Sequence, residues 1–158
     1  MSWITQRIEF DSGHRVLGHG GKCRHLHGHR YVAEVVVSAK VMNDLGMVID
    51  FGNVKRIIGD WIDSYWDHNL ILNTADPLLK LGMSHEVFAG REPFIMPGDM
   101  NPTAENMAQV LFTVCVERLE FMYQPDLFVV GDNALTVQSV TIHETPNCRS
   151  TFHRGETC

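Results

Sequence analysis

The residues around His27-Gly28-His29 constrain this chain more than any other stretch. A loop rich in glycine and basic residues ends there, and a run rich in β-branched residues continues to Ala39. Such a run predicts a strand from His29 to Ala39. In an extended chain, residues i and i+2 point to the same side, so His27 and His29 project together from one face. Two imidazoles at that spacing can chelate one ion, and histidine nitrogen suits zinc.

Two further residues, both upstream of His27, strengthen the prediction of a metal site. His14 follows the strand-like segment Trp3–Phe10, and Cys23 lies four residues before His27. Three histidines that leave a fourth position open are typical of a catalytic zinc site, whereas closed structural sites usually recruit cysteines. We therefore predict that Zn²⁺ is held by His14, His27 and His29. The alternative is that each is an ordinary core or surface histidine near a strand end.

Length and composition limit the class of protein. The 158 residues fit one domain, residues 1–158, of a globular protein. No apolar run approaches the roughly 20 residues of a membrane span. The amino terminus lacks the regions of a secretory signal, so we expect a cytoplasmic protein without a membrane partner. The four irregularly spaced cysteines do not predict a disulfide framework.

The net charge argues against a nucleic-acid partner, but the distribution of basic residues is compatible with binding a small polyanion. The net charge is −6, which disfavours a general nucleic-acid surface. Positive charge is nevertheless concentrated beside the histidines, at Arg15, Lys22, Arg24 and Arg30. The alternative is a solvated basic loop.

Hydrophobic periodicity predicts an α+β fold with a largely antiparallel sheet and two helices on one face. The expected strands are Trp3–Phe10, His29–Ala39, a short Met47–Ile49 that closes an antiparallel hairpin, Leu127–Val130 and Ala134–Glu144, with Thr145–Cys158 as a last edge segment. One helix is expected after an N-cap at Asp50, with an apolar stripe from Val54 to Tyr65, and another after Thr103, with a stripe from Met107 to Cys115 that extends to Met122. Asp76–Met100 is expected to be a long loop with one short helix. The sheet face without helices suits a partner subunit.

Several motifs, taken in order, resemble one enzyme family. They are Phe-x-x-x-His ending at His14, Cys-x-x-x-His-Gly-His from Cys23 to His29, Met-Val-x-Asp-Phe from Met47 to Phe51, Asp67-His68, Pro-Thr-x-Glu-Asn from Pro102 to Asn106, and Glu144-Thr145. The ordered set spans most of the chain and resembles the zinc-dependent 6-pyruvoyl- and 6-carboxytetrahydropterin synthases. The chain departs from the compact bacterial members at Asp76–Met100, which is longer.

The resemblance implies a tunnelling fold, in which trimers close an antiparallel barrel and two trimers stack. The homo-oligomer would act on a small pterin, 7,8-dihydroneopterin triphosphate. The implied residues are His14, His27 and His29 for zinc, Cys23 as a base, Asp67 and His68 as a catalytic pair, and Glu144, Thr103 and Glu105 for the substrate. Arg15, Lys22 and Arg24 are candidates for the triphosphate.

The spacing of Cys23 and His27 favours one product. It matches the bacterial carboxy-forming members, whereas animal pyruvoyl-forming members insert more residues there. The expected products are 6-carboxy-5,6,7,8-tetrahydropterin, acetaldehyde and triphosphate, for queuosine (deazapurine) biosynthesis. The alternative within the family is 6-pyruvoyl-tetrahydropterin with triphosphate. Two other classes stay open: a non-catalytic zinc- or pterin-binding module, and a water-activating zinc hydrolase.

Overall fold

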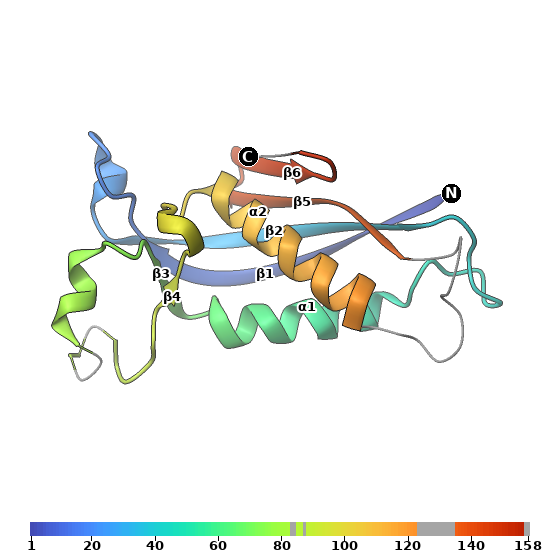
Figure 1. Ribbon diagram of the computed structural model, residues 1–158, viewed down its shortest axis with the longest axis horizontal. Coiled ribbons are helices and arrows are strands. Elements are labelled where there is room, and N and C mark those ends of the chain that lie inside the picture. Colours follow the sequence, from blue (N-terminus) through green and yellow to red (C-terminus); the bar gives the residue numbers. More distant parts are fainter. Residues whose placement is uncertain (83–84, 87, 123–134, 157–158) are drawn as a thin grey trace.

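Among the described residues, six strands form one open, mixed sheet in the order β4-β3-β1-β2-β5-β6 (Figure 1). The computed structural model describes residues 1–82, 85–86, 88–122 and 135–156. The strands are β1 (Ser2–His14), β2 (His27–Ala39), β3 (Asn69–Leu72), β4 (Phe94–Ile95), β5 (Thr136–Thr145) and β6 (Cys148–His153). The sequence predicted β1, β2 and β5, and the expected edge segment after Thr145 is β6.

The long β1–β2 pair sets the geometry of the histidines. The two strands run antiparallel, and their register places Ser2 opposite Ala39 at one end and His14 opposite His27 at the other. Side chains of β2 alternate as predicted, because Tyr31, Ala33 and Val35 are fully buried while the residues between them are partly exposed. Both strands extend further toward the connecting loop than predicted, so His14 and His27 belong to the sheet itself.

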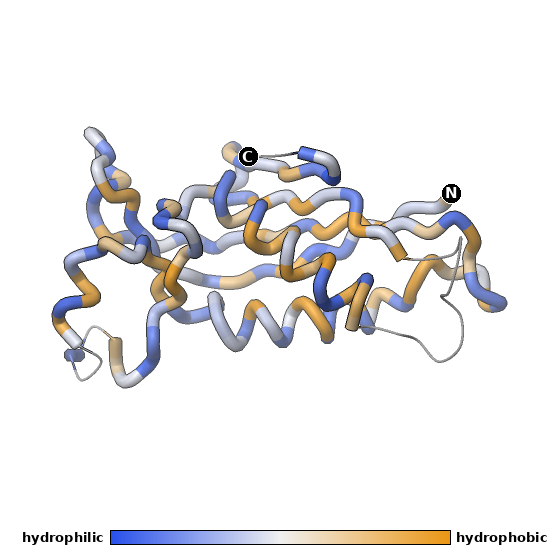
Figure 2. Tube along the Cα trace, viewed as in Figure 1, coloured by the Kyte–Doolittle hydropathy of each residue, from blue (hydrophilic) through white to orange (hydrophobic). Residues whose placement is uncertain are grey.

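Both predicted helices are present and share one core with the sheet. Asp50 caps α1 (Phe51–Tyr65), and its side chain accepts a hydrogen bond from the Gly52 amide. Thr103 caps α2 (Ala104–Cys115), which continues as a π-helix over Val116–Met122. In Figure 1, α2 crosses the central strands, and Figure 2 shows apolar residues recurring along both helices. The core joins one sheet face to both helices through residues that include Phe10, Tyr31, Val35, Val54, Ile58, Trp61, Met107 and Leu111.

The prediction of a strand at Met47–Ile49 is wrong. The side-chain oxygen of Asn43 accepts hydrogen bonds from the amides of Leu45 and Met47, at 3.0 and 2.9 Å. The Gly46 amide also donates to the Asn43 carbonyl. An asparagine that satisfies local amides in this way favours a compact turn over a strand ladder. No hairpin therefore follows β2, and the chain passes from a turn into α1.

The expectation of a largely antiparallel sheet also needs correction. β3 runs parallel to β1, and β4 runs parallel to β3. The predicted loop Asp76–Met100 thus contributes a sheet strand, besides 3₁₀ helices at Pro77–Leu81 and Pro97–Asp99. The expected strand Leu127–Val130 lies outside the described residues. Within the part of the chain that is described, no helix has both the length and the apolar character needed to cross a membrane.

Candidate metal centre

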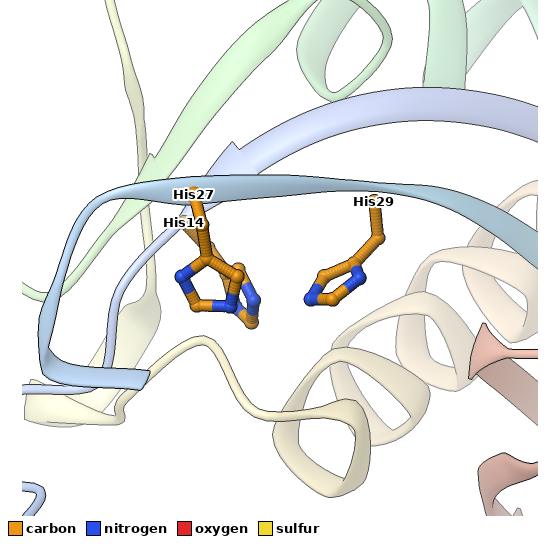
Figure 3. Close-up of side chains that lie close together, drawn as sticks. All are labelled: His14, His27 and His29. Carbon is orange, nitrogen blue, oxygen red and sulfur yellow. The ribbon is translucent and has the colours of Figure 1, made fainter. Parts of the chain in front are cut away.

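Three histidines converge at the loop end of the β1–β2 pair (Figure 3). His14 is the last residue of β1, and His27 and His29 lie at the start of β2. One ring nitrogen from each lies within 4.8 Å of the others. The centroid of the His14 ring is 4.6 Å from that of the His27 ring and 5.3 Å from that of the His29 ring. The strand register therefore brings together the three residues that the sequence predicted as zinc ligands.

Backbone carbonyls fix which nitrogen two of these rings present. His14 Nδ1 lies 2.6 Å from the Pro102 carbonyl oxygen, and His27 Nδ1 lies 2.7 Å from that of His25. A carbonyl can only accept, so Nδ1 carries the hydrogen in both rings and Nε2 keeps its lone pair. Histidines that bind metals usually donate their other ring N–H to such an acceptor. This arrangement fits metal binding.

Burial disfavours the charged form of two of the histidines and leaves two ring nitrogens without partners. The side chain of His14 is 1% exposed, and burial lowers the pKa of His14. Burial also lowers the pKa of His29. Among the described residues, Nε2 of His14 and Nε2 of His29 are buried and accept no hydrogen bond. Unpartnered buried nitrogens are costly, and a metal ion would satisfy both, so the residues present fit zinc.

Glu144 lies beside the histidines, near the end of β5. Its Oε1 atom is 3.5 Å from His14 Nε2 and 3.9 Å from His29 Nε2. The other two residues predicted to bind substrate lie at the start of α2. Thr103 Oγ1 accepts a 3.4 Å hydrogen bond from the Asn106 amide, and Glu105 is exposed in the first turn.

Cys23 lies in the loop before β2, within a short 3₁₀ helix at Lys22–Arg24. Its thiol is free and partly exposed. Its backbone carbonyl accepts a 2.8 Å hydrogen bond from the Val16 amide, which ties the two ends of the loop together. The cluster of mutually close ligand atoms contains the three histidines and does not include Cys23.

Asp67 and His68 form the expected pair in the turn after α1. Asp67 Oδ2 lies 2.7 Å from His68 Nδ1, and Asp67 Oδ1 accepts a 2.8 Å hydrogen bond from the Asp11 amide. His68 has a positive φ of 51°, and its ring lies against the carboxylate of the preceding residue, Asp67. The His68 side chain is 73% exposed and lines a cavity with Asp11, Arg30 and Arg91. This pair also lies outside the histidine cluster.

Two of the basic residues beside the histidines form ion pairs within the chain. Arg15 donates to the fully buried carboxylate of Asp76, with its Nε at 2.7 Å from Oδ2. Arg30 forms a two-pronged contact with Asp11, at 3.0 and 2.7 Å. Lys22 and Arg24 are exposed. The ion pair with Asp76 weakens the expectation that Arg15 holds the triphosphate, since that contact would have to break first.

Sequence reasoning missed the residues that support the site from the segment just before α2. The Asn101 side chain accepts from the Leu17 amide at 2.9 Å and donates to the Leu17 carbonyl at 3.1 Å. The next residue, Pro102, supplies the carbonyl that orients His14. Only the Pro-Thr-x-Glu-Asn motif beginning at Pro102 pointed to this region, and nothing local predicted a contact with a loop more than eighty residues earlier.

Comparison with known proteins gives a consistent family. The 6-pyruvoyl tetrahydropterin synthase family model matches residues 3–155. A Rickettsia felis protein named 6-carboxy-5,6,7,8-tetrahydropterin synthase is 44% identical over 144 residues, covering 91% of this chain and 94% of that protein. An Aquifex aeolicus protein of the same name is 33% identical over 137 residues, covering 76% and 83%.

Solved structures agree on the fold. An uncharacterised protein from Wolinella succinogenes has a TM-score of 0.76 at 24% identity and covers 97% of this chain and 98% of its own. The 6-pyruvoyl tetrahydropterin synthase of Caenorhabditis elegans has a TM-score of 0.63 at 23% identity, covering 96% and 94%. The resemblance predicted from the sequence motifs is thereby confirmed: the chain belongs to the 6-pyruvoyl tetrahydropterin synthase family.

Proposed function

We propose that this protein converts 7,8-dihydroneopterin triphosphate to 6-carboxy-5,6,7,8-tetrahydropterin, acetaldehyde and triphosphate, with zinc held by His14, His27 and His29. The observation that carries the proposal is the histidine cluster, in which two rings are oriented by backbone carbonyls and two buried Nε2 atoms lack a partner. Zinc bound there would polarise the side-chain oxygens of the substrate and stabilise negative charge on them. Family membership supplies the pterin class of substrate.

Cys23 is the proposed base for the substrate side chain. It lies on a loop whose ends are held by the contact between Val16 and the Cys23 carbonyl and by the clamp from Asn101 to Leu17. The thiol is free and partly exposed and is not part of the histidine cluster, which supports a role as a base and not as a metal ligand. Its conjugate thiolate can accept a proton from the substrate side chain.

The Asp67–His68 pair is the proposed second proton-transfer group, supplied to the site of a neighbouring chain. Asp67 holds the Nδ1 side of the His68 ring, so Nε2 is left to exchange a proton. The ring is 73% exposed and separate from the histidine cluster of its own chain. A homo-oligomer, either a trimer or a dimer of trimers, would place this exposed pair against a second chain's histidines.

The substrate ring is proposed to lie between Glu144 and the start of α2. A carboxylate can accept two parallel hydrogen bonds from the amino-pyrimidine edge of a pterin, which positions the ring without reacting with it. Glu144 lies within 4 Å of two of the histidine nitrogens, so a ring held there would place its side chain near the metal. Thr103 and Glu105 are the other proposed substrate contacts, at the α2 N-terminus.

The choice of product rests on the relatives and on loop length. Proteins named 6-carboxy-5,6,7,8-tetrahydropterin synthase from Rickettsia felis and Rickettsia bellii are 44% and 41% identical over 91% of the chain. Cys23 and His27 are four residues apart, and loop length sets which substrate proton the thiolate reaches. The carboxy product would serve queuosine biosynthesis. The second candidate is 6-pyruvoyl-tetrahydropterin, the product in the name of the family model.

A product assay separates the two candidates. Zinc-loaded protein is incubated with 7,8-dihydroneopterin triphosphate, and acetaldehyde and triphosphate are measured together. We expect equal amounts of both, because side-chain cleavage releases one of each per turnover. Triphosphate without acetaldehyde would support the pyruvoyl product instead. Release of neither by zinc-replete protein would contradict both and favour a pterin-binding module without catalysis.

A further inference from the structure

Glu144 occupies a position that a substrate-binding role alone does not explain. It follows Val140 and Ile142 on the same face of β5, and those two residues are fully buried in the core. This face carries the Glu144 side chain toward the histidines, where one oxygen, Oε1, lies 3.5 Å from His14 Nε2 and 3.9 Å from His29 Nε2. The side chain is 28% exposed, so most of it is enclosed by the protein.

The contact between Glu144 and His14 brings two hydrogen-bond acceptors together. His14 Nδ1 donates to the Pro102 carbonyl, so the neutral ring presents a lone pair at Nε2. A carboxylate oxygen carries only lone pairs as well. Neither His14 Nε2 nor His29 Nε2 has a hydrogen-bond partner among the described residues. Facing lone pairs in a buried place repel each other, and a cation between them turns that repulsion into attraction.

The distances suit a shared metal ion. In a tetrahedral zinc site with bonds of about 2.0–2.1 Å, neighbouring ligand atoms are about 3.3–3.4 Å apart. The two separations from Glu144 Oε1 to the histidine nitrogens, 3.5 and 3.9 Å, are close to that edge length. The group of ligand atoms that all lie within 4.8 Å of one another holds the three histidines, without Cys23 and without Glu144. Glu144 is the carboxylate that lies within 4 Å of two of the three histidine nitrogens, so it is the candidate for the fourth corner of a tetrahedron.

We propose that Glu144 is the fourth zinc ligand of the substrate-free protein. The inference rests on the proposed function only in requiring that the three histidines bind zinc. It adds a metal-binding role to a residue otherwise expected to hold the pterin ring. A substrate that takes either the fourth metal position or the Glu144 carboxylate has to displace this bond, so the carboxylate keeps the site closed until the substrate arrives.

Cobalt substitution tests the proposal without turnover. Co²⁺ replaces zinc in such sites, and its visible absorption reports the number and type of ligands. The spectrum is measured for the wild type, for Glu144→Gln and for Glu144→Asp, each without substrate. Glu144→Asp is the matched control for charge, because it keeps the negative charge and withdraws the oxygen by one methylene. Cys23→Ala is the control for a residue outside the ligand set.

If Glu144 is a ligand, both Glu144 variants should change the cobalt spectrum. Both should also lower the zinc affinity, measured by competition with a chelator, by about tenfold or more. Cys23→Ala should leave the spectrum and the affinity unchanged. Spectra of both Glu144 variants that match the wild type would overturn the proposal, as would a zinc affinity that Glu144→Asp fully preserves. Wild-type protein that binds neither cobalt nor zinc would instead refute the metal site of the proposed function.

Discussion

At the scale of single residues, the histidines are oriented by the fold before any metal binds. The Pro102 carbonyl holds His14, and the His25 carbonyl holds His27, both at less than 2.8 Å. Tyr31 lies next along β2 and contacts the His14 and His29 rings edge-on, with centroids 5.8 and 5.5 Å away. Ligands whose rotamers are fixed in this way bind a metal with less loss of conformational freedom.

Cys23→Ala is expected to keep the metal and lose most of the turnover. The thiol lies outside the ligand cluster, so zinc content and the cobalt spectrum should match the wild type. Loss of a general base typically costs about 10²–10⁴-fold in rate. Zinc content and triphosphate release are measured on the same preparation. A zinc-free variant would make Cys23 a ligand, whereas a zinc-replete variant with nearly full activity would remove its catalytic role.

At the scale of elements, one buried ion pair connects the end of β1 to the segment after β3. The Asp76 carboxylate is fully buried, accepts from Arg15 and caps the short helix Pro77–Leu81 through the Leu78 amide at 2.8 Å. The same contact raises the pKa of the Arg15 guanidinium. Arg15 directly follows His14, so this pair also fixes the direction in which the chain leaves the metal centre.

Asp76→Ala is expected to lower the free energy of unfolding by about 3 kcal/mol. Removing one partner leaves the other charge poorly solvated, and breaking a buried pair typically costs about 3–5 kcal/mol. We expect the lower end because the Arg15 side chain is 21% exposed. Urea denaturation is compared with that of Asp44→Ala, which removes a carboxylate from an exposed loop. Similar midpoints for the two variants would contradict a structural role for the pair.

The elements that the sequence predicted are those with a strong local pattern. β1, β2 and β5 are ten or more residues long, and α1 and α2 carry long apolar stripes and capping residues. β3 and β4 have four and two residues, too few for any periodicity, and their parallel pairing depends on distant strands. Met47–Ile49 has strand-forming residues, but the Asn43 side chain accepts hydrogen bonds from the Leu45 and Met47 amides, which favours a turn.

The same contrast holds within the site. The type and spacing of His14, His27 and His29 are visible in the sequence, and the register of β1 and β2 brings them together. The Pro102 carbonyl could not be predicted, because a backbone oxygen has no sequence signature and lies 88 residues from the ring it orients. The contact between Arg15 and Asp76 could not be predicted either, because the two residues lie 61 positions apart and no local pattern pairs them.

At the scale of the whole molecule, the sheet has open edges among the described residues. β3 pairs only with Ser12–His14 of β1, so the edge of β1 from Ser2 to Phe10 has no strand neighbour among the described residues. β6 is the last strand at the other end of the sheet. Trp3 is 58% exposed on this same stretch of β1. Long exposed edges are usually covered in native proteins, and a second copy of the chain would do so.

We therefore expect a homo-oligomer with shared sites. Light scattering at micromolar concentration should give a trimer or a dimer of trimers. Cys23→Ala and His68→Ala should each be nearly inactive. Unfolding and refolding them together should restore up to about a quarter of the activity, since random mixing places both intact residues at one site in four. A monomeric mass, or mixed oligomers without restored activity, would contradict sites shared between chains.

Elemental analysis of the purified protein tests most directly whether His14, His27 and His29 hold zinc. The wild type should contain about one zinc per chain. His27→Ala and His29→Ala should each lose most of it, because each variant lacks one of the three histidine ligands. His19→Ala, which changes an exposed histidine of the preceding loop, should retain it. Undiminished zinc in both His27→Ala and His29→Ala would contradict the assignment of this centre.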